Sequence, residues 1–324
     1  SGVVQLALLM WATSRAGMPM RVPRPRLTPQ MRVLLRRMAP GLVGAGVTQL
    51  NLAVDVIIAS LLPAGTVSLL YYADRVNQLP LGVIGTAVGT AMLPLLSRQV
   101  RAGEAVAARG TLNRALEYAL FLTLPAAMAL GVAAYPIMWV LFGRGAFDAE
   151  SARLSAQALA AYALGLPAFV VVKVLAPGFF ARGDTSTPVK IGVCAVALNL
   201  ALNFAFMVPL RHVGPALATS LAAIFNVGWL AFALHRRGHL QLDPQIRRRL
   251  PRMMLAAVAM AAALYFADGP LFAAAEAGRG LKWVAFALLV TLGFAVYAIA
   301  GQLLGAFDLR DLWRLLARRR RVGA

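Results

Sequence analysis

An arginine and an aspartate stand side by side in a stretch of the chain that is otherwise too apolar for water. Asp74 and Arg75 belong to the run Leu-Leu-Tyr-Tyr-Ala-Asp-Arg-Val-Asn at residues 69–77. Ionised groups inside hydrocarbon are costly and are usually kept for a task. A guanidinium can bind a phosphate through two parallel hydrogen bonds, so Arg75 is a candidate anion-binding group. The alternative is a structural ion pair, with Asp74 or with Asp55 as its partner.

Four more polar residues fall at a similar depth in the expected helices. Counted at about 1.5 Å per residue, they lie roughly 8–15 Å below the same membrane surface as Arg75: Asp55, Asn199, Asn203 and Thr219. A carboxylate with neutral oxygens suits a small hard cation, and transporters hold coupling ions near the middle of the membrane. This layer therefore predicts an ion site, with Na⁺ as the candidate ion. The open alternative is hydrogen bonding between helices, worth about 0.6 kcal/mol for each bond.

A second cation, Lys173, lies about 13 Å from the opposite surface of the membrane. Its ammonium group either extends to that surface or adds a second charge along a substrate path. Pro177 and Gly178 follow on the same helix, where they would loosen the backbone and form a hinge for a gate. Gly85 and Gly89 permit a close helix contact, although that signal is weak.

The chain carries no recognisable catalytic constellation. No nucleophile is paired with a base, no glycine-rich phosphate loop follows a strand, and the three histidines lack metal-ligand spacing. Cys194 is the single cysteine, so no disulfide can form within the chain. We therefore expect neither an enzyme nor a resident cofactor.

Composition places the chain in a membrane. Of its 324 residues 60% are hydrophobic and only 14% are charged, and the mean hydropathy is +0.72, whereas a soluble domain is about 25% charged. Apolar stretches of about 20 residues predict transmembrane helices, and the strand alternation of a β-barrel is absent. The expected spans are 38–62, 66–96, 115–142, 154–181, 188–208, 214–234, 252–267 and 281–304, after the end of a truncated helix at 1–12.

The net charge of +20 follows from an uneven distribution between loops. Most basic residues fall in alternate connections, beginning with the Arg- and Pro-rich linker 13–37 and ending with the tail 305–324. By the positive-inside rule these connections and the C-terminus are cytoplasmic. This explains the charge without nucleic acid, and the basic loops can also bind anionic lipids.

Two long motifs resemble those of the MurJ/MviN lipid II flippases. The first extends from Gln49 to Pro94 and includes Val-Asp-Val-Ile-Ile-Ala-Ser at 54–60 and Tyr-Tyr-Ala-Asp-Arg at 71–75. The second is Lys-Val-Leu-Ala-Pro-Gly-Phe-Phe-Ala-Arg-Gly-Asp-Thr-Ser-Thr-Pro-Val-Lys at 173–190. Span patterning extends the resemblance over essentially the whole chain, on hydropathy alone from about residue 240.

The resemblance implies an all-α polytopic fold of the superfamily that holds the multidrug and oligosaccharide-lipid exporters. The chain would then contain the end of a sixth helix at 1–12, a second six-helix lobe at 38–236, a basic cytoplasmic loop at 237–251 and two C-terminal helices at 252–304. In the family these two helices are associated with a groove for a lipid tail. The arginine equivalent to Arg75 lines a basic cavity between the lobes, and the other key cavity arginines belong to the first lobe, which this chain would lack.

The function implied is transport of the undecaprenyl-pyrophosphate-linked peptidoglycan precursor across the bacterial inner membrane by alternating access. Arg75, Asp74 and Lys173 are the candidate substrate-binding residues, and lipid II, membrane lipids and cell-wall synthesis proteins are the candidate partners. Two alternatives remain. One is a cation-coupled exporter of drugs or polysaccharide lipids, and the other is a membrane scaffold that transports nothing.

Overall fold

The computed structural model describes residues 2–15, 29, 31–32, 46, 49, 53, 56–63, 65–275 and 281–306. The chain forms two compact units, Ser1–Leu42 and Val43–Ala324. In the first unit the helix α1 extends from Gly2 to Arg15. The expected linker and tail, and Asp55, lie wholly or largely outside the described residues.

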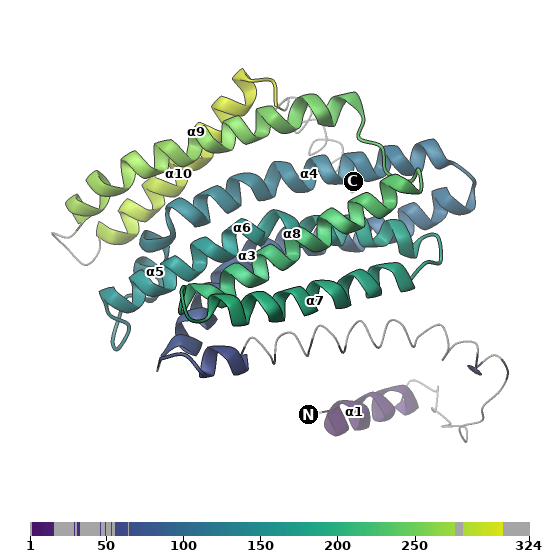
Figure 1. Ribbon diagram of the computed structural model, residues 1–324, viewed down its shortest axis with the longest axis horizontal. Coiled ribbons are helices and arrows are strands. Elements are labelled where there is room, and N and C mark those ends of the chain that lie inside the picture. Colours follow the sequence, from purple (N-terminus) through teal and green to yellow (C-terminus); the bar gives the residue numbers. More distant parts are fainter. Residues whose placement is uncertain are drawn as a thin grey trace. The chain divides into compact units, whose positions relative to one another are not determined.

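The second unit is all-α in its described part, as predicted (Figure 1). Its helices are α3 (Thr66–Arg101), α4 (Ala105–Val132), α5 (Ala134–Phe142), α6 (Ala149–Phe180), α7 (Ser186–Phe206), α8 (Val213–Arg236), α9 (Pro244–Ala275) and α10 (Leu281–Leu303). Seven helices within the described ranges, all of these except α5, are long and apolar enough to cross a membrane. The chain is a multi-pass membrane protein.

Helix α6 forms the centre of this unit. It packs against α3, α4, α5 and α8, while α7 lies along α8 and the hairpin of α9 and α10 lies along α4 (Figure 1). Of the apolar window of α6, 61% is buried, against 22–39% in the other spans. Because lipid tails are as apolar as leucine, helices in a membrane associate through close packing and hydrogen bonds. Ser220 of α8 accordingly donates to the carbonyl of Ala161 at 2.7 Å, and a Cβ on Gly165 would stand 2.7 Å from the Ser220 hydroxyl.

The expected span 115–142 is divided into two helices. Helix α4 begins ten residues earlier and ends at Val132, and α5 follows after Ala133. Pro136, in the first turn of α5, has no N–H for the carbonyl of Val132, and its ring crowds that carbonyl. The helix therefore breaks just before the proline, a detail that hydropathy does not report.

The expected span 252–267 is also too short, because α9 extends from Pro244 to Ala275. Its first two turns hold three consecutive arginines, and this polarity placed them outside the predicted span. The Asp243 carboxylate accepts the backbone N–H of Ile246 at 2.8 Å and so caps the helix where the apolar pattern has not yet begun.

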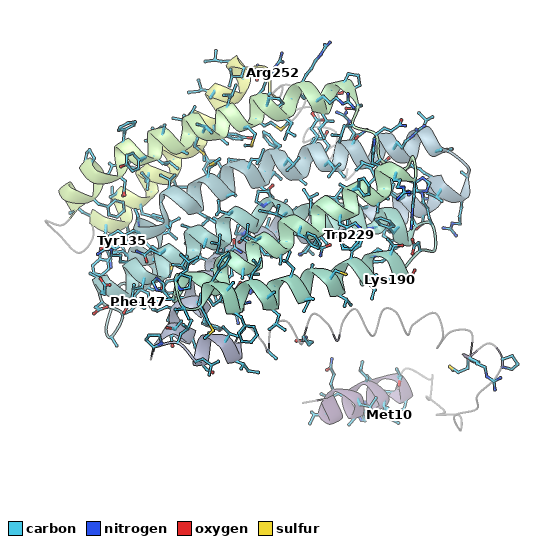
Figure 2. The ribbon with its side chains drawn as sticks, viewed as in Figure 1. Met10, Tyr135, Phe147, Lys190, Trp229 and Arg252 are labelled. Atoms are coloured by element: carbon cyan, nitrogen blue, oxygen red, sulfur yellow. The ribbon has the colours of Figure 1, made fainter. Side chains whose placement is uncertain are left out.

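Basic residues gather at one end of the second unit. The loop after α8 bonds to the start of α4 through Asn113, which donates to the carbonyl of Gln241 at 2.8 Å. Arg252 of α9 donates to the carbonyl of Gly305, just past α10, at 3.2 Å. Lys190 lies at this end and Tyr135 and Phe147 lie at the other (Figure 2). The cytoplasmic orientation predicted from loop charge stays a prediction.

Candidate functional site

A groove of about 560 Å³ is bordered by α3, α6, α8 and the helical residues 56–59. Most of its lining is apolar, from residues such as Leu70, Leu81 and Phe169. Five polar side chains also reach it, and these are Asp74, Asn77, Gln78, Lys173 and Thr219. The groove therefore brings together two predicted substrate-binding residues and one predicted ion-binding residue from three helices.

Arg75 lies beside this groove and not in its lining. Its guanidinium lies over the ring of Tyr71, 4.8 Å from the ring centroid, and Tyr71 does line the groove. Asp74 accepts a hydrogen bond from Gln78. Within the described part of the chain Arg75 forms no ion pair with a carboxylate. Arg75 is an exposed residue.

Lys173 points across α3 and does not extend along α6 to the membrane surface. A Cβ placed on Gly85 would stand 2.8 Å from Nζ, and one on Gly89 would stand 3.9 Å from the lysine Cβ. The glycines predicted to permit a close helix contact thus make room for this lysine. Lys173 forms no ion pair with any described residue. It also lines a neighbouring groove of about 510 Å³ between α6, α7 and α8, so this residue borders both grooves.

Asn199, Asn203 and Thr219 meet as the sequence predicts. Asn203 donates to the side-chain oxygen of Asn199 at 2.9 Å, and Asn199 donates to the Thr219 hydroxyl at 3.1 Å. Both asparagines are buried, whereas Thr219 borders the two grooves. The first bond lies within α7, and the second joins α7 to α8. No cluster of three metal-binding side chains occurs among the residues that the structure describes.

Two polar residues of the groove, Asn77 and Gln78, were missed by sequence reasoning. Asn77 follows Asp74 by three residues and is only 2% exposed. Its side-chain oxygen accepts no hydrogen bond within the described ranges. A buried oxygen without a hydrogen-bond donor destabilises the fold, so Asn77 is expected to bind a ligand or a water molecule. The i, i+3 spacing with Asp74 could have revealed that both residues share a helix face.

The predicted hinge lies in the last turn of α6. Pro177 and Gly178 are both buried, and a Cβ on Gly178 would lie 3.4 Å from Leu234 and 3.6 Å from Leu112. Arg182 donates to the Gly178 carbonyl at 2.5 Å. The glycine therefore allows α6 to lie close to both α8 and α4.

A third groove, of about 470 Å³, is almost wholly apolar. Helices α4, α5, α9 and α10 supply most of its walls. Its small residues include Ala126, Ala129, Ala133 and Gly293. Tyr297 of α10 donates to the carbonyl of Phe121 at 2.8 Å and fixes one wall to the other. This groove lies where the resemblance places a site for a lipid tail.

Comparison with known proteins identifies the family. The profile of the lipid II flippase MurJ matches residues 1–272. A probable lipid II flippase MurJ of Rhizobium tropici is 39% identical over 322 residues, and one of Rhizobium meliloti (strain 1021) is 42% identical over 320. The chain belongs to the MurJ lipid II flippase family.

The fold agrees with this membership. A solved lipid II flippase MurJ in an inward closed conformation matches with a TM-score of 0.71 at 26% identity, over 89% of this chain and 57% of that one. An outward-facing multidrug resistance transporter of the MATE family, in the MOP superfamily, shares the fold at a TM-score of 0.57 and 18% identity, over 82% of this chain and 63% of that one. The alignments cover 99% and 98% of this chain but 60% of each rhizobial relative, so the chain spans about three fifths of a curated MurJ protein.

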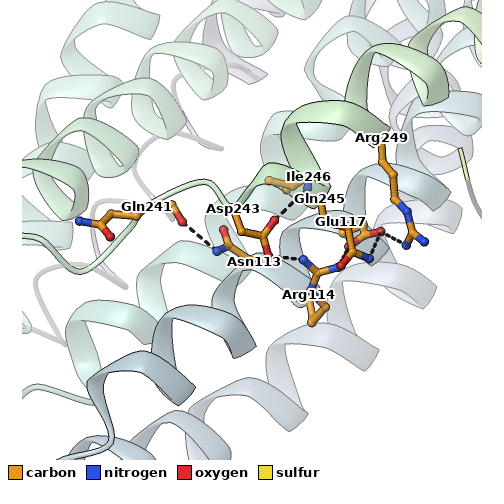
Figure 3. Close-up of polar contacts among 8 residues, drawn as sticks. All are labelled: Asn113, Arg114, Glu117, Gln241, Asp243, Gln245, Ile246 and Arg249. Carbon is orange, nitrogen blue, oxygen red and sulfur yellow. Dashed lines mark hydrogen bonds and ion pairs between the residues drawn. The ribbon is translucent and has the colours of Figure 1, made fainter.

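An ion-pair network joins α4 to the α9–α10 hairpin of this MurJ-family chain, and the sequence analysis did not predict it (Figure 3). Glu117 of α4, whose side chain is 5% exposed, binds Arg249 at 2.5 Å and also binds Arg114. Arg114 binds Asp243, the cap of α9. Two cations and two carboxylates thus neutralise one another. The sequence signal that could have revealed this network is Glu117, an acidic residue within the apolar span 115–142.

A second ion pair holds the loop between α6 and α7 in this MurJ-family chain. Asp184 accepts hydrogen bonds from the N–H and hydroxyl of Thr187 at 3.0 and 2.6 Å, and from Arg237 at 2.5 Å. Although burial opposes ionisation, these donors hold the pKa of Asp184 well below its usual range. Gly183 has φ +77°, which lets the chain reverse direction there.

Proposed function

We propose that this chain forms the second lobe and the C-terminal helix pair of a lipid II flippase. Its substrate would be the undecaprenyl-pyrophosphate-linked peptidoglycan precursor, which crosses the bacterial inner membrane. The observation that carries the proposal is Lys173, a cation without a carboxylate partner among the described residues, in a groove at membrane depth. Such a charge is expensive in hydrocarbon and is accounted for by an anionic ligand.

The polar groove supports binding of the pyrophosphate and the head group. Lys173 would supply a point charge, and Arg75, beside the groove and exposed, would supply a planar fork of donors. Asp74 and Asn77 would accept hydrogen bonds from the uncharged part of the head group. Phosphate binding here would be charge-assisted, and an enclosed site would strengthen it.

The apolar groove supports binding of the polyprenyl tail. The small side chains of its three alanines and one glycine leave a groove of about 470 Å³ that a hydrocarbon chain can fill. Each methylene removed from water contributes about 0.8 kcal/mol, although a tail that is already in lipid gains less. The groove would guide the tail while the head group moves.

Alternating access would move the head group, with the two lobes rocking about the cavity. Pro177 and Gly178 are the proposed hinge, and Pro177→Ala, which can restore a backbone hydrogen bond, should slow transport without lowering expression.

The proposed Na⁺ site consists of Asp55, Asn199, Asn203 and Thr219. If transport by Asp55→Ala depended on Na⁺ as the wild type does, the ion site would be excluded.

The basic end of the helices would face the cytoplasm, with the C-terminus on that side. Cysteines introduced at Arg247 and at Glu150, in a Cys194→Ser background, would lie at opposite ends. An impermeant maleimide added outside spheroplasts should label only the Glu150 position. Cell-wall synthesis proteins would be partners at either surface.

Complementation tests the function. Cells depleted of their own lipid II flippase should grow with the complete gene and fail with Lys173→Ala or Arg75→Ala, at equal expression. Growth of both variants would favour the scaffold interpretation. Drug efflux without lipid II transport would instead favour an exporter of the same superfamily.

A further inference from the structure

The helix ends around the loop that follows α8 carry a second set of arginines, and two of these have no carboxylate partner among the described residues. Arg109 of α4 donates to the amide oxygen of Gln241 at 2.9 Å. Arg182, just past α6, donates to the carbonyl of Gly178 at 2.5 Å. In the described part of the chain neither arginine forms an ion pair. Both guanidiniums therefore keep a full positive charge with donors to spare.

These two arginines and Arg237 border the short loop that holds His239. Arg237 precedes the histidine by two residues and lies over the Phe179 ring, 5.4 Å from its centroid, and the Arg182 N–H donates to the Phe179 carbonyl at 2.9 Å. Arg109 binds Gln241, two residues after the histidine. All three lie close enough to the imidazole to act on it electrostatically, and they come from α4, the end of α6 and the end of α8. Burial first, and then the three guanidiniums, lower the pKa of His239 and favour its neutral form. Arg237 is paired with Asp184. Three guanidiniums and one carboxylate leave an excess of positive charge at this point.

The cluster would lie at the level of phospholipid head groups. The apolar spans of α6 and α8 end at Phe180 and Arg236, so Arg182, Arg237 and His239 follow within three residues. Gly238, with φ +71°, turns the chain back so that Gln241 reaches α4, where it accepts hydrogen bonds from Arg109 and Asn113. A basic pocket between transmembrane helices at this level is suited to a lipid phosphate.

We propose that Arg109, Arg182, Arg237 and His239 form a binding site for the phosphate group of an anionic phospholipid, separate from the grooves described above. Arg109 and Arg182 would contact the phosphate oxygens directly. Arg237, positioned by Asp184 and by Thr187, to which it donates at 3.0 Å, would close one side. The site requires neither the flippase activity nor a particular orientation, because either leaflet of a bacterial membrane can present such a lipid.

Native mass spectrometry of the purified 324-residue chain tests the site, with phosphatidylglycerol and phosphatidylcholine offered together. The wild type should retain phosphatidylglycerol preferentially, and Arg109→Gln with Arg182→Gln should reduce that preference roughly tenfold or more. Arg247→Gln with Arg248→Gln removes the same charge from exposed positions at the same end and should change it little. Equal losses in the two double variants, or no loss in the first, would overturn the proposal.

Two further arms complete the test. Inorganic phosphate at constant ionic strength should not displace phosphatidylglycerol if the lipid is the ligand, and displacement would assign the same site to free phosphate. Should the first double variant fail to fold, a photoreactive phosphatidylglycerol can be applied to the wild type. Cross-links at 180–184 and 237–241 support the site, and cross-links confined to 247–252 contradict it.

Discussion

The side chain of Lys173 in α6 crosses α3 at Gly85, where an added Cβ would stand 2.8 Å from both Nζ and Cδ of the lysine. This contact places a cation of one membrane helix in a notch of another. The glycine determines where the ammonium group lies in the groove. Because the near atoms belong to the flexible end of a lysine, the lysine and not the backbone would move to admit a methyl group.

Gly85→Ala should displace the ammonium group and weaken substrate binding. We expect roughly a fivefold loss of lipid II affinity, equivalent to about 1 kcal/mol of overpacking. Gly82→Ala is the matched control, since Gly82 lies on the same helix, lines the same groove and has nothing within 4 Å of an added Cβ. Binding of a fluorescent lipid II analogue measures both. Equal affinities for the two variants would contradict the assignment of Lys173.

Glu117→Gln should destabilise the attachment of α9 and α10. Neutralising Glu117 leaves Arg114 and Arg249 without their buried partner, and because these arginines are 31% and 29% exposed, we expect a cost of about 1–3 kcal/mol. Thermal unfolding in detergent should show a midpoint several degrees lower. Glu104→Gln, at an exposed position before the same helix, should stay within about 0.5 kcal/mol of the wild type. If Glu117→Gln unfolded at the same temperature as Glu104→Gln, the ion-pair network would not stabilise the fold.

Asp184 should make stability depend on pH in the acid range. Its folded-state pKa is depressed, so its contribution is present above the unfolded value of about 3.9 and is lost as pH falls toward the folded-state pKa. Asp184→Asn should therefore be less stable than the wild type at pH 7, and the difference should shrink below about pH 4. Unfolding midpoints from pH 7 to pH 3 measure it. A difference that stays constant over this range would contradict the ionic role.

Ala129→Trp should fill the apolar groove and obstruct the lipid tail. If two or three methylenes lose contact, affinity falls by about 2 kcal/mol, or roughly thirtyfold. A lipid II analogue with a short tail should bind as before, which separates obstruction from misfolding. Ala197→Trp, at an exposed position of α7, is the control. Equal loss for long and short tails would rule out a tail site in this groove.

Hydropathy was sufficient to predict seven of the helices, because a span of about 20 apolar residues has few other uses. It failed where polarity and backbone chemistry decide the ends. The arginines in the first two turns of α9 led to a predicted start at residue 252, whereas the helix begins at Pro244, where Asp243 caps it. Pro136 broke a continuous apolar stretch, so that α4 and α5 are separate.

The convergence of the site could be predicted only in part. Asn199, Asn203 and Thr219 were placed at one depth by counting residues, and their hydrogen bonds confirm that they meet. Lys173 was counted from the other surface, about 13 Å away, which in a core of about 30 Å is close to the same level. Which face of α6 meets α3 could not be derived, because α6 is apolar on all sides.

The most direct test of the anion-binding groove is lipid II translocation in proteoliposomes made with the complete gene product, comparing the wild type, Lys173→Ala and Lys173→Arg. The account predicts that Lys173→Ala abolishes translocation while its unfolding midpoint stays near that of the wild type, and that Lys173→Arg retains part of the rate. Translocation by Lys173→Ala at the wild-type rate would contradict it.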